Sequence, residues 1–129
     1  MTTRAPFFLA ALIACASSAR AMNIRSSQKQ IARAADGTAL VEVREDGPEG
    51  GGALTYRVQG KKPGDVVDFV VSSDFSPGDG STPQTVSAET CRQRLAALDA
   101  ELAKRKIPGV TLHPEGCASA RRAGLVVAK

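Results

Sequence analysis

Alternating hydrophobic and polar positions predict three β-strands in the first half of the chain. They cover residues 37–46, 53–60 and 65–75, and in the second of them the apolar side chains recur at every other residue, as in a half-buried strand. The glycine-rich stretch 47–52 separates the first two strands and predicts a hairpin with a loose tip. The positions expected to face the core are Leu54, Tyr56 and Val58 in the second strand, and Val67, Phe69 and Val71 in the third.

A helical pattern follows at residues 87–107. Ser87 suits the N-cap, basic residues occupy the last turn, and Pro108 with Gly109 stops the helix. Apolar residues spaced four, three and four apart predict one buried stripe. That stripe comprises Cys91, Leu95, Leu98 and Leu102.

Two further apolar stretches, at 110–113 and 124–129, predict a fourth strand and a short fifth one. Strands followed by a helix that lies over one face define an α+β fold, a small two-layer domain with a mainly antiparallel sheet of four to five strands. We expect residues 36–129 to form this single domain. The polar stretch 22–35 is expected to be a flexible N-terminal segment.

The first 21 residues are typical of a cleaved secretory signal peptide. Arg4 precedes the apolar run 7–16, and Ala19 and Ala21 are the small residues that signal peptidase requires before Met22. Cleavage would remove two basic residues and no acidic one, leaving 15 basic against 13 acidic residues and a net charge of +2 instead of +4. We therefore expect a periplasmic or secreted protein without a transmembrane helix, because the apolar run is too short to span a bilayer.

Residues 12–15, with the sequence LIAC, also resemble the lipobox of bacterial lipoproteins. The resemblance implies that Cys15 would be acylated and would become the first residue of an outer-membrane lipoprotein. This alternative stays open beside cleavage before Met22. Either way, two cysteines remain, and an even number in an exported chain predicts a disulfide between Cys91 and Cys117. The helix and the ten residues after it are long enough to return the chain from one cysteine to the other.

The candidate chemistry is sparse, so we expect an exported, non-catalytic binding or accessory protein of the bacterial envelope. A small secreted hydrolase is the alternative, and it would need His113, the only histidine, to meet Asp74 or Asp79 in a cleft. No residue pattern predicts a metal site or a cofactor. Nucleic acid is not an expected partner, because the chain has no tryptophan and its basic residues are not interleaved with aromatic ones.

The predicted order of elements brings five basic residues to one end of the domain. The turn between the second and third strands lies at the end where the helix finishes, whereas several acidic residues gather at the opposite end. We expect the basic end to contact an anionic envelope surface or an acidic protein. Its residues are Lys61, Lys62, Lys104, Arg105 and Lys106.

Overall fold

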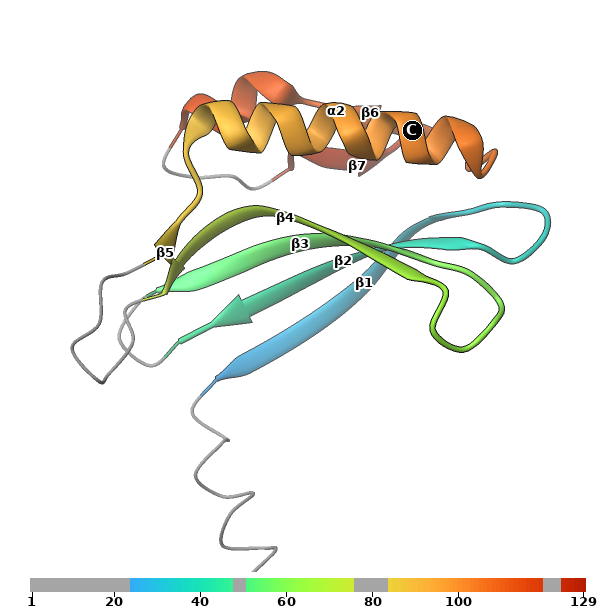
Figure 1. The fold of residues 1–129 in the computed structure, drawn as a ribbon, viewed down its shortest axis with the longest axis horizontal. Helices are drawn as coiled ribbons and strands as arrows, with labels where there is room; N and C mark the ends of the chain where they lie inside the picture. The colour runs from blue at the N-terminus through green and yellow to red at the C-terminus, as the bar shows by residue number, and fades with distance from the viewer. Residues whose placement is uncertain (1–23, 48–50, 76–83, 120–123) are drawn as a thin grey trace, which may run out of the picture.

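The computed structural model describes residues 24–47, 51–75, 84–119 and 124–129 (Figure 1). The predicted signal peptide and Cys15 lie outside the described residues, as does Asp79. The elements in chain order are β1 (Arg25–Arg33), β2 (Ala39–Asp46), β3 (Gly52–Gln59), β4 (Val66–Phe75), β5 (Gln84–Thr85), α2 (Ala88–Lys104), β6 (Val110–Leu112), the 3-10 helix η3 (Pro114–Ala118) and β7 (Val126–Ala128).

Strands β1 to β4 form an antiparallel sheet in sequence order, and the two-residue β5 adds to the edge of β4. In β3, Tyr56 pairs with Glu42 on one side and with Phe69 on the other, so these three side chains share one face. A register shift in the β3–β4 ladder leaves Val71 as an extra residue, and its side chain is fully buried. The predicted fold class is confirmed.

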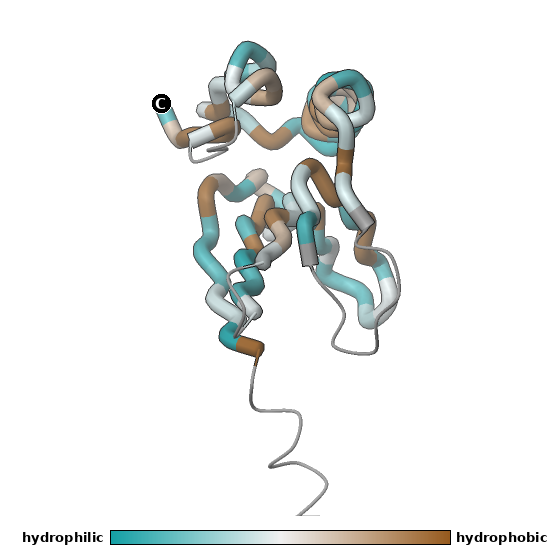
Figure 2. Tube along the Cα trace, turned by 90° about the vertical axis from the view of Figure 1, so that its left-hand side faces the viewer, coloured by the Kyte–Doolittle hydropathy of each residue, from teal (hydrophilic) through white to brown (hydrophobic). Residues whose placement is uncertain are grey.

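A second layer covers one face of this sheet (Figure 1). It consists of α2, which lies over β4 and β3, and of a separate two-stranded sheet made of β6 and β7. Figure 2 looks at the molecule from the side and separates α2 from the β6–β7 pair within this layer. The two layers enclose one hydrophobic core. Its largest fully buried side chains are Tyr56, Leu40, Leu95, Leu98, Leu125, Val58 and Val71.

The sequence pattern identified α2 closely. Ser87 is the N-cap and its side chain accepts a hydrogen bond from the Thr90 N–H, while the four predicted stripe residues are the ones that α2 buries. The helix ends in a Schellman motif, in which the N–H of Lys106 donates to Ala103 and that of Ile107 donates to Leu102. Lys106 has a φ of 55°, although glycine is the residue that adopts this conformation without strain.

Residues 22–35 were expected to be a flexible segment outside the domain, and this prediction is wrong for Arg25–Arg33. These residues form β1, which pairs with β2 along its length. The strand was missed because its sequence, RSSQKQIAR, is almost entirely polar and has no alternation. Its backbone hydrogen bonds to β2 stabilise β1 as an edge strand, although most of its side chains are exposed.

The strands at 110–113 and 124–129 are present but do not belong to the main sheet. They pair with each other, Thr111 opposite Val127, and lie in the second layer beside α2. Periodicity predicts that a short apolar segment is a strand, but it does not specify the partner of that strand. The partner is determined by the connection through η3, which the disulfide joins to the start of α2.

Candidate functional site

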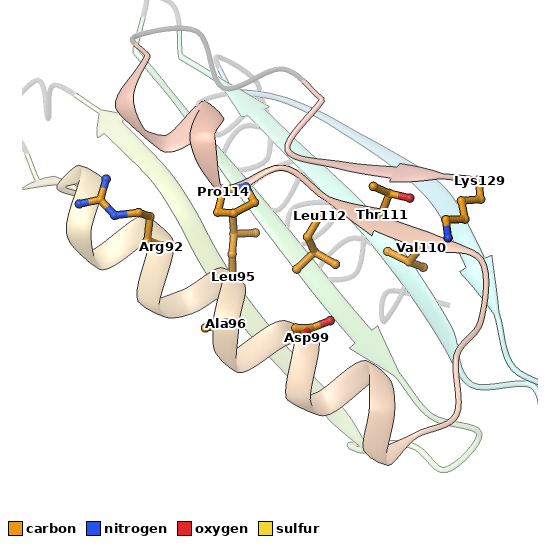
Figure 3. Close-up of a pocket in the computed structure, with 9 residues that line it drawn as sticks. All are labelled: Arg92, Leu95, Ala96, Asp99, Val110, Thr111, Leu112, Pro114 and Lys129. Atoms are coloured by element: carbon orange, nitrogen blue, oxygen red, sulfur yellow. The ribbon is translucent and has the colours of Figure 1, made fainter.

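A groove of about 460 Å³ lies between α2 and β6 on the outer layer (Figure 3). Its apolar surface comes from Leu95 and Ala96 on the helix and from Leu112 on the strand, which points toward the helix. The remaining lining residues are Arg92, Asp99, Val110, Thr111, Pro114 and Lys129. An apolar groove with a few polar groups on its rim is the usual form of a ligand site.

One wall of this groove is a free strand edge. The N–H of His113 donates to Leu125 and that of Lys129 donates to Gly109, so alternate residues of β6 direct their peptide groups toward β7. The peptide groups of Val110 and Leu112 therefore point away from β7. Within the described part of the chain, no hydrogen bond is made by these outward-facing groups. Such an edge is a template for another extended segment.

Charged side chains stand at the two ends of the groove (Figure 3). Arg92, in the first turns of α2, lies at the end where Pro114 begins η3, and Lys129 lies at the other end beside Val110. Asp99 is on the helix wall between them. Arg92 and Lys129 have no ion-pair partner among the described carboxylates. The charged side chains of the rim are thus two basic residues and one acidic residue.

The predicted pair of Cys91 and Cys117 is bonded in the structure, at a sequence separation of 26. Both side chains are buried, and the bond joins the first turn of α2 to η3. Arg92 belongs to α2 and Pro114 belongs to η3, so the disulfide also holds one end of the groove together.

The predicted basic end is assembled around Asp65. Both terminal nitrogens of Arg105 donate to the Asp65 carboxylate at 2.8 Å, and the Arg105 Nε donates to Glu101 at the same distance. The hydrogen bonds from Arg105 lower the pKa of Asp65, and the nearby charges of Lys62 and Lys104 lower it further. The end of α2 and the turn between β3 and β4 are therefore in contact.

The third turn at this end, between β1 and β2, also joins the cluster. The Lys61 side chain packs on Gly37, and Asp36 has a lowered pKa, mainly because it accepts hydrogen bonds from Thr38 and secondarily because Lys61 and Arg105 are near. Thus the structure brings together the basic residues that the element order predicted. Their role in binding stays a prediction.

Of the residues of the hydrolase alternative, His113 and Asp74 have different hydrogen-bond partners, and Asp79 lies outside the described residues. His113 occupies the N-cap position of η3, and its Nδ1 lies 3.0 Å from the Glu115 carboxylate. Asp74, near the end of β4, instead accepts a hydrogen bond from the N–H of Gly52 at 2.7 Å. The described residues contain no cluster of three or more histidine, cysteine or acidic side chains that could hold a metal ion. They likewise include no helix with the length and apolar character needed to cross a bilayer.

One polar network is buried beneath β7. The Tyr56 hydroxyl accepts a hydrogen bond from the Val126 N–H at 3.2 Å and donates to the Glu42 carboxylate at 3.3 Å. Glu42 also accepts from Arg44, and burial raises the pKa of Tyr56 well above its usual value. These contacts fasten the second layer to the main sheet, which is a structural role.

No protein-family model, curated protein or solved structure matches this chain. Function is therefore inferred from the geometry of the groove and of the basic end. The groove was missed at the sequence level, because its walls come from a helix and a strand whose adjacency depends on the tertiary fold. The available signal was the short strand pattern at Val110–Leu112, shortly after the helix ends at Lys104.

Proposed function

We propose that this protein is an exported, non-catalytic binding protein of the bacterial envelope, and that the groove between α2 and β6 binds an extended peptide segment. The single observation that carries the proposal is the free edge of β6 beside an apolar groove. Binding of this kind adds a strand to an exposed edge: main-chain hydrogen bonds supply affinity, and pockets for alternate side chains supply specificity.

The dimensions and chemistry of the groove favour a short ligand. Three residues of β6 extend about 10 Å, enough to pair with three to five residues of an extended segment. Val110 and Leu112 would each exchange main-chain hydrogen bonds with it, while the side chains of Ala96 and Leu112 would contact its apolar side chains. Arg92 and Lys129 at the two ends favour acidic residues at either end of the ligand.

Export is supported by the Cys91–Cys117 disulfide, since such bonds persist in oxidising compartments. A periplasmic or secreted location follows if the signal peptide is removed before Met22, and an outer-membrane lipoprotein follows if Cys15 is acylated. The intact mass of the protein purified from its host distinguishes these two forms. Acyl chains on Cys15 would establish the lipoprotein form and leave the proposed groove function unaffected.

A synthetic pentapeptide, EVTVE with blocked termini, is a suitable probe because it places an acid at each end of the groove in either direction of binding. Isotope-edited NMR should show that the peptide shifts the amide signals of Val110 and Leu112. It should also slow their hydrogen exchange, because these N–H groups would gain an acceptor. A control peptide, ESGSE, has the same charge but no apolar side chains and should bind much more weakly.

Two neighbouring alanines of α2 provide a matched pair of protein variants. Ala96 lines the groove, whereas Ala97 is exposed and is not part of the lining. Ala96→Arg should fill the groove and abolish EVTVE binding, while Ala97→Arg should leave it unchanged. Equal affinity in both variants, or amide shifts confined to elements other than β6 and α2, would refute the proposal.

A further inference from the structure

We propose that the basic end of the domain is a second binding surface, which docks the protein on a bilayer rich in anionic lipid. This inference is independent of the peptide groove. The surface consists of Lys61, Lys62, Lys104 and Lys106. It is presented by the β3–β4 turn, by the last residue of α2 and by the turn that follows α2.

The four lysines are available for an external partner. All are exposed, and none forms an ion pair with a described carboxylate. Arg105, by contrast, is bound to Asp65 and Glu101 and holds the two turns together. Arg105 is thus a positioning residue, and the free charges around it are compact, hydrated ammonium groups. Ammonium groups are better suited to electrostatic attraction to many lipid headgroups than to bidentate hydrogen bonding with a single phosphate.

Lys106 provides an independent indication that its charge is used. It occupies the C′ position of the Schellman motif, with a φ of 55° that strains any residue with a Cβ atom. A glycine would adopt this conformation more easily, so a lysine at this position lowers the stability of the turn. Its side chain is exposed and makes no ion pair with the described acidic residues, so packing does not explain its presence.

The residues beside these lysines favour a lipid surface over a soluble acidic protein. Both turns carry exposed prolines, Pro63 and Pro108, and Val66 at the start of β4 is a large apolar residue that is 42 % exposed. Cationic side chains interspersed with small apolar groups match the interface between headgroups and acyl chains. Asp36 and Asp65 reduce the positive charge, so the predicted attraction is moderate and sensitive to salt.

Co-sedimentation of the protein purified from the exported fraction tests the proposal. The vesicles contain phosphatidylglycerol with phosphatidylcholine, or phosphatidylcholine alone. Binding should require the anionic lipid, and it should be lost between about 0.01 M and about 1 M salt, as the Debye length falls from about 30 Å to about 3 Å. Lys61→Gln/Lys62→Gln and Lys104→Gln/Lys106→Gln should each weaken it about 25-fold, since each lysine at such a surface contributes about 1 kcal/mol.

Arg25→Gln/Lys29→Gln is the matched control, because it removes two exposed charges from β1 and gives the same net charge. It should bind almost as tightly as the wild type. Equal loss of binding in the control would overturn the proposal, since net charge and not this surface would then be responsible. Retention on alginate without binding to the anionic vesicles would also overturn it, in favour of a polysaccharide partner.

Lys106→Gly separates the effect of the lysine charge on binding from the effect of the strained backbone on stability. The variant should melt at a higher temperature than the wild type, because glycine relieves the strained φ, and yet it should bind anionic vesicles about fivefold more weakly. A higher melting temperature with unchanged affinity for the vesicles would exclude Lys106 from the contact surface.

Discussion

Tyr56→Phe isolates the contribution of a buried hydroxyl that joins the two layers of this domain. Tyr56 is fully buried, and it is the only tyrosine in the chain. Its ring packs in the core, while its hydroxyl accepts from the Val126 N–H and donates to Glu42. Phenylalanine keeps the ring and removes only the oxygen. The change in stability therefore reports the hydrogen bonds and not the loss of buried apolar area.

The expected loss is about 2 kcal/mol in the free energy of unfolding. Val126 is 2 % exposed, so its N–H would be left buried without an acceptor, which costs about 1 to 3 kcal/mol. The lost hydrogen bond to Glu42 contributes less to the destabilisation. The Glu42 carboxylate keeps its hydrogen bond from Arg44, and the Glu42 side chain is 12 % exposed. At about 1 kcal/mol per molar urea, the unfolding midpoint should fall by about 2 M.

Urea unfolding at pH 7 measures this difference, with Glu42→Gln as the comparison. Glutamine can still accept from Tyr56, so Glu42→Gln should destabilise by less than Tyr56→Phe. The pKa of Tyr56 is raised in the folded state, so the wild type should lose extra stability as the pH rises above about 10, where the unfolded tyrosine ionises. Tyr56→Phe should lack this alkaline loss. An unchanged midpoint, or an equal effect of Glu42→Gln, would refute the reasoning.

Two further predictions concern the disulfide and the basic end. Cys91→Ser together with Cys117→Ser should lower the free energy of unfolding by about 3.5 kcal/mol, the entropic contribution expected from a 26-residue separation, and a small change in the urea midpoint would contradict it. The pKa of Asp65 is lowered by Arg105, so the stabilisation from this pair is complete above the unfolded value of about 4 and is lost as the pH falls below it. Asp65→Asn should therefore remove part of the acid sensitivity seen in unfolding curves between about pH 5 and pH 2, and identical pH profiles would be the contrary result.

The sequence determined those features that depend on local pattern. Ser87 at the N-cap and the stripe that begins at Cys91 specify both the start of α2 and its buried face, because capping and 3.6-residue periodicity act within a few residues. Alternation likewise specified the inward side chains of β3, including Tyr56. The pairing of Cys91 with Cys117 could be predicted because only two cysteines remain after residue 21.

Only the tertiary structure decided which elements are neighbours. The polar residues of β1 form a strand because they pair with the edge of β2. This pairing depends on another part of the chain, so it leaves no alternating pattern in the sequence of β1. The separation of β6 and β7 from the main sheet depends on how the chain returns after η3. The edge of β6 at Val110 and Leu112 is free because, among the described residues, only β7 pairs with this strand. The groove could therefore not be predicted from the sequence, because its two walls, on α2 and on β6, are brought together by packing on a common core.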